Sequence, residues 1–152
     1  MVEFPYSKHD ASLEETVQLA KEVAGCIGVV EIIVLNGNLG TGKTFFIKNV
    51  LRNLGIHNVS SPTFTLINEY CGKFNVYHFD FYRINKPEEL IDIGYYDYFN
   101  GNAVIFIEWG DLFPAMLPLR RIEVNIAFSP AYGPEFKNDQ DSSRIFLIKK
   151  YE

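Results

Sequence analysis

The sequence predicts an α/β fold, a single domain over residues 1–152 in which helices cover a mixed, partly antiparallel sheet. Two apolar runs, residues 32–35 and 103–107, lack polar interruptions and are typical of strands that are covered on both faces. Two later segments, residues 120–128 and 144–149, alternate apolar and polar residues, which predicts an antiparallel hairpin with one exposed face. A chain of 152 residues also has the usual size of one domain.

The first helix is predicted over residues 13–25. Ser12 and Glu15 have the spacing of a capping box, and the glycines at 25 and 28 end the helical pattern. The apolar stripe of this helix consists of Leu13, Val17, Ala20, Ala24 and Ile27. We therefore expect Thr16 to lie on the polar face.

A glycine-rich loop follows the strand at residues 32–35. Residues 37–44 fit the pattern G-x-x-x-x-G-K-[ST], in which glycines let backbone N–H groups close around phosphate oxygens. A helix comes next, with apolar residues at helical spacing up to Leu54 and a left-handed stop at Gly55. The order of strand, loop and helix predicts a P-loop NTPase-like fold with three layers, and a nucleoside polyphosphate as ligand.

The residue types in this loop suit a nucleotide. We expect the Lys43 ammonium to contact the β and γ phosphates and to be catalytic, and the Thr44 hydroxyl to bind Mg²⁺. The positive end of the following helix would face the same anion. The expected nucleotide-binding residues are Asn38, Leu39, Gly40, Thr41, Gly42, Lys43, Thr44 and Phe45.

A loop with free hydroxyl groups follows this helix at residues 60–64, Ser-Ser-Pro-Thr-Phe. Pro62 forces extended backbone around it. Such a segment is either ordered by a γ-phosphate and Mg²⁺, as in nucleotide switches, or it is an ordinary proline-containing turn.

A second hairpin is predicted from residues 63–70 and 75–79, which are rich in β-branched and aromatic residues. If its second strand stays extended, His78, Asp80 and Tyr82 share one face of it. This polar face belongs either to a functional site or to a solvated sheet surface with a local ion pair.

Glu108 ends the apolar run of residues 103–107. A carboxylate at the end of a buried strand is the second signature of phosphate-loop enzymes, where it reaches Mg²⁺ through water or orients the attacking water. The alternative is an ordinary charged residue at a strand end.

Two further segments carry no visible chemistry. Residues 87–93 are predicted to form a short helix with proline near its first turn. Residues 129–143 are polar, contain proline and glycine, and are predicted to form a long surface loop.

Composition limits the partners and the compartment. The net charge of −5 argues against a domain that binds tRNA or DNA by itself, because such domains neutralise phosphates with a basic surface. No run approaches the ~18 apolar residues of a membrane span, and no secretory signal begins the chain, so we expect a cytoplasmic protein without membrane contact. The two cysteines and the histidines lack the spacing of a zinc site.

Four motifs appear in an order that resembles one family. They are Gly-Asn-Leu-Gly-Thr-Gly-Lys-Thr at 37–44, Ser-Pro-Thr-Phe at 61–64, His-Phe-Asp-Phe-Tyr-Arg at 78–83 and Ile-Glu-Trp at 107–109. Together they resemble the bacterial TsaE (YjeE) family, the ATPase needed to make threonylcarbamoyladenosine in tRNA. The resemblance covers about residues 12–110.

The resemblance implies a small α/β protein that hydrolyses ATP weakly alone and works with the TsaD and TsaB proteins, so that tRNA is reached only through them. It implies catalytic roles for Lys43, Asp80 and Glu108, and Mg²⁺ binding by Thr44 and Glu108. It further implies a surface that responds to nucleotide and partners, made of Ser61, Pro62, Thr63, Phe64 and Trp109. Whether Asp80 or Glu108 orients the attacking water stays open.

Three other functions compete with this one. A small-molecule kinase would bring arginines over the transferring phosphate, whereas only Arg83 lies in a motif here. A GTPase would read guanine with N-K-x-D, but residues 85–88 end in glutamate and no D-x-x-G precedes them. A nucleotide-dependent scaffold without useful turnover would differ only in showing no ATP hydrolysis stimulated by TsaD and TsaB.

Overall fold

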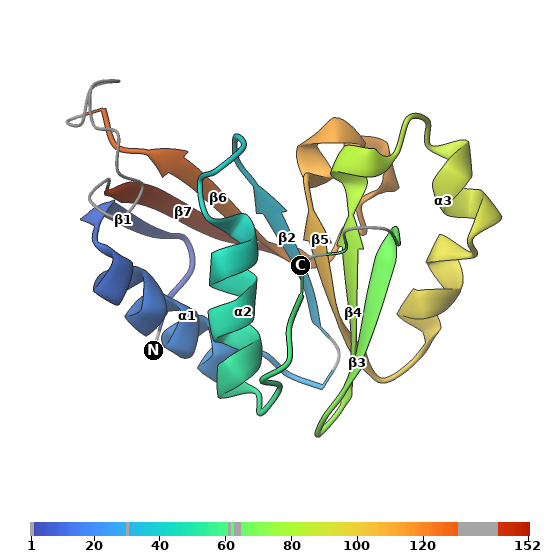
Figure 1. Cartoon of the computed structure of the whole chain (residues 1–152), viewed down its shortest axis with the longest axis horizontal. Coiled ribbons are helices and arrows are strands. Elements are labelled where there is room, and N and C mark those ends of the chain that lie inside the picture. The colour runs from blue at the N-terminus through green and yellow to red at the C-terminus, as the bar shows by residue number, and fades with distance from the viewer. Residues whose placement is uncertain (1, 30, 61, 63–64, 131–142) are drawn as a thin grey trace.

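In the computed structural model, seven strands form one mixed sheet in the order β1-β7-β6-β2-β5-β4-β3 (Figure 1). The structure describes residues 2–29, 31–60, 62, 65–130 and 143–152. The strands are β1 (Tyr6–Ala11), β2 (Glu31–Asn36), β3 (Ile67–Cys71), β4 (Asn75–Asp80), β5 (Ala103–Glu108), β6 (Arg121–Phe128) and β7 (Arg144–Tyr151). Strands β6, β2, β5 and β4 run parallel, whereas β7, β1 and β3 are antiparallel to their neighbours. The predicted α/β class with a partly antiparallel sheet is confirmed.

Helices cover the sheet on two sides. The α-helices are α1 (Leu13–Cys26), α2 (Lys43–Asn53) and α3 (Glu88–Asp92), and the 3₁₀ segments are η1 (Phe81–Arg83), η2 (Tyr95–Asn100), η3 (Gly110–Leu112) and η4 (Pro114–Met116). Helices α1 and α2 lie together over one face (Figure 1), and α3 packs with η2 and η4 against the opposite face. This arrangement gives the three predicted layers.

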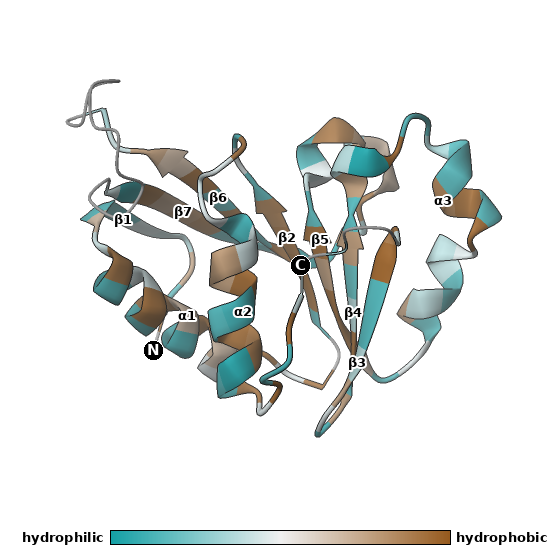
Figure 2. Ribbon diagram, viewed as in Figure 1, coloured by the Kyte–Doolittle hydropathy of each residue, from teal (hydrophilic) through white to brown (hydrophobic). Residues whose placement is uncertain are grey.

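The two faces of the central strands bury separate cores. Ile33, Leu35 and Phe106 pack with residues of α1 and α2, whereas Val34 and Ile107 point to the opposite face and pack with residues of α3, η2 and η4. Figure 2 accordingly shows strands β2 and β5 as largely hydrophobic, while α1 and α2 are hydrophobic in part only. Burial on both faces is the physical reason why the runs at 32–35 and 103–107 lack polar alternation.

Helix α1 begins as predicted but faces the sheet with a different stripe. Ser12 and Glu15 form the predicted capping box. Leu13 and Val17, however, are 51% and 38% exposed, whereas Thr16 is buried. The expected polar position of Thr16 is therefore wrong. Its hydroxyl donates to the Ser12 carbonyl, 2.8 Å away, so its burial leaves no donor unsatisfied.

Strand boundaries differ from the predictions at three places. Strand β1 was not predicted, because as an edge strand beside β7 it has little apolar alternation. Strand β3 starts only at Ile67, although a strand was predicted from residue 63. Strand β4 ends at Asp80, so Tyr82 lies in η1 and does not extend the polar face of the strand.

Candidate functional site

The polar ends of three parallel strands meet at one edge of the sheet. Asn36, Asp80 and Glu108 are the last residues of β2, β4 and β5, and Asp80 lies opposite Glu108 in the ladder. Parallel strands place their carboxyl ends together, and open α/β sheets bind ligands at this edge. The glycine-rich loop, residues 37–44, follows β2 at the same edge.

Glycines shape this loop because its backbone takes positive φ angles. Gly37 has φ +148°, and a Cβ there would lie 2.3 Å from the Ile126 carbonyl oxygen of the neighbouring strand. Gly42 has φ +101° and precedes the first turn of α2, which no side chain of the described residues caps. The first N–H groups of α2 therefore face the loop, where an anion could accept them.

Lys43 is folded back onto the loop. Its Nζ donates to the carbonyl oxygens of Gly37 at 2.6 Å and Asn38 at 3.0 Å, and it lies 3.8 Å from the centre of the Trp109 ring. Burial lowers the pKa of this ammonium, and nearby carboxylates offset part of that effect. A ligand with a phosphate group would offer Lys43 stronger acceptors than two neutral carbonyls.

Glu108 connects the loop to strand β4. The Thr44 hydroxyl donates to Glu108 Oε1 at 2.9 Å and is 3.2 Å from Oε2. His78 Nε2 lies 2.9 Å from the same Oε1. Glu108 and His78 are 3% and 0% exposed, so this carboxylate is held by protein groups in a largely dry place. It is therefore no ordinary solvated residue at a strand end.

Asp80 lies beside this group in a different environment. Burial raises the pKa of its carboxyl, and the charge of Glu108 acts in the same direction. The backbone N–H of Tyr82, which donates to Asp80 at 3.0 Å, opposes the rise. A carboxyl with a raised pKa is easier to use as a proton acceptor near neutral pH.

Trp109 turns the chain beside Lys43. It has a left-handed backbone, with φ +61°, and a Cβ on the following Gly110 would lie 2.3 Å from Val34. Its ring packs on that of Tyr82, with 4.8 Å between ring centres. Trp109 therefore lies beside Lys43 and Tyr82 at the candidate site, and its role toward nucleotide and partners stays a prediction.

A pocket of about 420 Å³ lies among these groups. Its lining includes most of the predicted nucleotide residues and both acids, with Arg83 and Tyr82 in addition: Leu39, Gly40, Gly42, Lys43, Thr44, Phe45, Asp80, Tyr82, Arg83, Glu108 and Trp109.

Two predicted nucleotide residues lie outside this lining. The Thr41 hydroxyl donates to the Asn38 carbonyl at 2.9 Å, and the Thr41 carbonyl accepts from Arg144 Nε at 2.9 Å. Asn38 itself lines a neighbouring pocket of about 590 Å³ between the loop and strands β6 and β7. Asn38 and Thr41 therefore contribute to the conformation of the loop without lining the pocket of about 420 Å³.

The predicted switch segment cannot be placed in full. Ser61, Thr63 and Phe64 lie outside the described residues, and Pro62 is buried. Residues 131–142 of the predicted long surface loop also lie outside the described residues. At the base of this loop, the Ser129 N–H donates to the Ser143 carbonyl at 3.1 Å. The role of residues 61–64 stays a prediction.

Sequence reasoning assigned no role to several residues near the site. Two of these residues, His78 and Tyr82, were placed on the predicted polar face of the strand. The alternation of polar and aromatic residues along β4 was therefore the signal that could have assigned His78 to the site. Asn36 had no such signal, yet its amide donates to Asn125 at 3.2 Å and accepts from the Asp111 N–H at 3.1 Å. These bonds fix the end of β2 where the glycine-rich loop begins.

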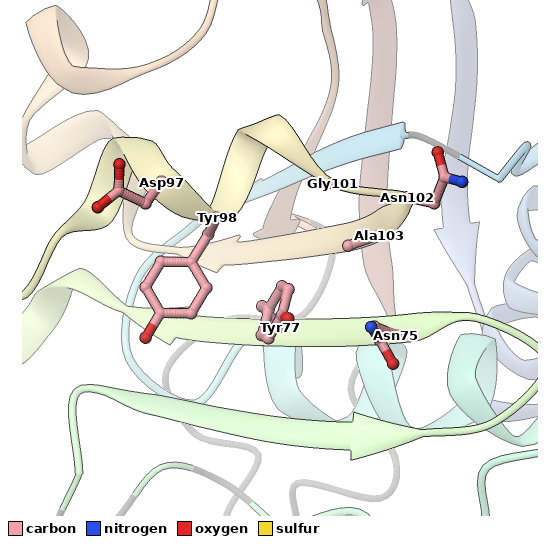
Figure 3. Close-up of a pocket in the computed structure, with 7 residues that line it drawn as sticks. All are labelled: Asn75, Tyr77, Asp97, Tyr98, Gly101, Asn102 and Ala103. Atoms are coloured by element: carbon pink, nitrogen blue, oxygen red, sulfur yellow. The ribbon is translucent and has the colours of Figure 1, made fainter.

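A smaller pocket of about 240 Å³ lies at the amino ends of β4 and β5 (Figure 3). The rings of Tyr77 and Tyr98 meet edge to face beside it, and Asp97 is at its rim. Its lining contains no lysine or arginine, so it has no cation for a phosphate. The glycine-rich loop remains the better candidate for an anionic ligand.

Among the described residues, two other features are absent. No group of three or more His, Cys, Asp or Glu residues is placed to hold a metal ion there. No helix in this part of the chain is long and apolar enough to cross a membrane.

Comparisons with known proteins agree with the motifs. The model of the family "Threonylcarbamoyl adenosine biosynthesis protein TsaE" matches residues 10–133. The tRNA threonylcarbamoyladenosine biosynthesis protein TsaE of Rickettsia conorii is 42% identical over 118 residues, which cover 76% of this chain and 67% of that protein. The protein of the same name from Bacillus subtilis is 41% identical over 115 residues, covering 74% and 72%.

The crystal structure of YdiB from Bacillus subtilis is similar along nearly the whole chain. It has a TM-score of 0.65 and 30% identity, and the match covers 99% of this chain and 88% of YdiB. The predicted P-loop NTPase-like fold is thereby confirmed. The chain belongs to the TsaE family of tRNA threonylcarbamoyladenosine biosynthesis proteins.

Proposed function

We propose that this protein binds ATP with Mg²⁺ and hydrolyses it in tRNA threonylcarbamoyladenosine biosynthesis, so that the complex of TsaD and TsaB can turn over repeatedly. The observation that carries this proposal is the contact of Thr44 with Glu108 beside Lys43, in a pocket of about 420 Å³. A phosphate-binding lysine, a hydroxyl and an acid in this arrangement are the parts that phosphoryl transfer requires.

The loop and α2 supply the groups for the phosphates. Backbone N–H groups around Gly42 and the positive end of α2 attract the anion. Lys43 would exchange the Gly37 and Asn38 carbonyls, which it contacts in this structure, for phosphate oxygens. Because its Nζ also lies over the Trp109 ring, such a movement would give Trp109 a way to report whether nucleotide is bound.

The chemistry of Thr44 and Glu108 fits Mg²⁺. The Thr44 hydroxyl donates its hydrogen bond to Glu108, so the lone pairs of its oxygen remain available to a cation. Mg²⁺ prefers oxygen ligands and keeps several waters, so one hydroxyl and one carboxylate suffice beside the phosphates. When bound, the ion would neutralise charge on the transferring phosphoryl group. Glu108 would hold it directly or through water.

Two carboxylates, those of Asp80 and Glu108, line the pocket and could orient the attacking water. Glu108 is fixed by two hydrogen bonds, whereas Asp80 accepts one backbone bond and has a raised pKa. Arg83 lines the same pocket and would place positive charge near the γ-phosphate. Both acids remain candidates for the residue that accepts the proton of water.

Charge favours a role through protein partners. The net charge of −5 opposes direct binding of tRNA or DNA, so tRNA would be reached through TsaD and TsaB. Residues 61–64 and Trp109 would form the surface that changes with nucleotide and contacts these partners. This role would be carried out in the cytoplasm.

Depletion and rescue test the proposal. Mass spectrometry of tRNA nucleosides should show loss of threonylcarbamoyladenosine after depletion, rescue by the wild type and no rescue by Lys43→Ala. Purified protein should hydrolyse ATP slowly alone and faster with TsaD and TsaB. Unchanged modification after depletion, or full rescue by Lys43→Ala, would contradict the proposal. Nucleotide binding without stimulated hydrolysis would favour a scaffold.

A further inference from the structure

We infer that His78 is a positioning residue for the reaction proposed above. In this inference, which rests on that proposed function, the Nε2–H of His78 holds Glu108 Oε1 and thereby fixes the direction in which Glu108 Oε2 and Thr44 face the pocket. His78 touches neither nucleotide nor metal in this arrangement, and it acts through Glu108.

The geometry separates His78 from an ordinary core histidine. Its side chain is fully buried, and its Nε2 lies 2.9 Å from an oxygen of an acid that is itself 3% exposed. Both residues are on strands that end at the site, and His78 reaches diagonally from β4 to the last residue of β5. A buried polar side chain costs free energy unless a partner compensates it, and here the partner is a candidate acid of the site.

The contact also selects one tautomer of the imidazole. A carboxylate only accepts hydrogen bonds, so Nε2 must carry the proton that points to Glu108. His78 Nδ1 is buried and has no hydrogen-bond partner among the described residues. An Nδ1 lone pair without partner costs less than a buried Nδ1–H without partner would, which favours the tautomer with hydrogen on Nε2 only.

Fixing one oxygen of Glu108 has a consequence for Thr44. Glu108 Oε1 receives both the Nε2–H of His78 and the hydroxyl of Thr44, each at 2.9 Å. Without His78, the carboxylate could rotate about its last bond, and the Thr44 hydroxyl could turn with it. Groups that orient ligands in this way typically contribute 10–100-fold to metal affinity or activity.

Two substitutions and a control test this role. His78→Leu keeps an apolar side chain but removes the donor, whereas His78→Gln can place an amide N–H near the position of Nε2. The exposed His57→Leu is the matched control. Binding of Mg²⁺ would be measured by the fluorescence of Trp109, the one tryptophan of the chain, during Mg²⁺ titration with a non-hydrolysable ATP analogue.

We expect His78→Leu to weaken the apparent Mg²⁺ affinity by 10–100-fold and to lower partner-stimulated turnover by a similar factor. Binding of the analogue without Mg²⁺ should change little, since His78 does not face the phosphates. His78→Gln should recover most of the loss, and His57→Leu should match the wild type. A folded His78→Leu protein with wild-type Mg²⁺ affinity, or failure of Gln to recover it, would overturn the inference.

A spectroscopic readout on the wild type remains if His78→Leu does not fold. The protein has three histidines, so ¹⁵N–¹H correlation through the imidazole rings can assign the tautomer of each. We expect His78 to carry its proton on Nε2 alone, and a proton on Nδ1 alone would refute the contact with Glu108. If the wild type binds nucleotide without any response to Mg²⁺, the proposed function fails, and this inference fails with it.

Discussion

Replacing Glu108 with glutamine is the sharpest test of the site, because it removes a charge and almost no volume. The amide oxygen can take the place of Oε1 and accept from both Thr44 and His78. Each bond to a neutral acceptor is weaker by about 1 kcal/mol than one to a carboxylate. Relief from burying a charge offsets part of this loss. We therefore expect the free energy of unfolding to change by less than about 2 kcal/mol.

Turnover should respond far more strongly than stability. Loss of a preorganised charge in an active site typically costs ~3–4 kcal/mol of transition-state stabilisation, about 10²–10³ in rate. Nucleotide binding should fall by less than about tenfold, because Lys43 and the loop N–H groups are unchanged. Calorimetry would measure binding, and ATP hydrolysis with TsaD and TsaB would measure kcat.

Glu31→Gln is a matched control for Glu108→Gln. Glu31 is also a buried glutamate on a central strand, but it begins β2 and lies at the opposite edge of the sheet from the site. The control should therefore keep normal turnover whatever it does to stability. Wild-type kcat in Glu108→Gln, at a melting temperature within about 8 °C of the wild type, would show that the charge of Glu108 is not used.

Three further outcomes are expected. Lys43→Ala should lower turnover a few hundredfold, about 3–4 kcal/mol, and near wild-type hydrolysis would place the reaction elsewhere. Gly37→Ala should lower the melting temperature by about 2–12 °C, since its Cβ would overlap the Ile126 carbonyl and its φ is strained; an unchanged temperature would contradict the loop geometry. Asp80→Asn should raise the stability of the nucleotide-free protein, because burial raises the pKa of this carboxyl and its ionised form is therefore unfavourable. The gain in the free energy of unfolding should be complete above the raised pKa and vanish below the ordinary value of 3.8. Denaturant unfolding of both proteins at several pH values would measure it, and a gain that grows as the pH falls would contradict the reasoning.

Local patterns predicted the parts of the fold that depend on local physics. Strands buried on both faces need continuous apolar runs, and the glycine-rich loop needs backbone freedom at fixed positions, so both were visible in sequence. Strand β1 depends on pairing with β7, more than 130 residues away in the ladder, and its own residues indicate little. The buried face of α1 was predicted wrongly at Thr16. The hydroxyl of Thr16 can be buried because it donates to the Ser12 carbonyl, and the spacing of apolar residues does not reveal such a hydrogen bond.

The site itself combines both kinds of information. The types and positions of Lys43, Thr44 and Glu108 were readable because the chemistry demands them, whereas the bond from His78 to Glu108 depends on the order of strands. Strand β5 lies between β2 and β4 although β4 precedes it in the chain, and only this order brings His78 beside the acid that Thr44 contacts. If β4 and β3 exchanged places, the same sequence motif would lie on the edge strand, separated from β5 by β3, and His78 would be too far from Glu108 to donate to it. The contact between His78 and Glu108 therefore favours the observed strand order and also holds an acid of the candidate site.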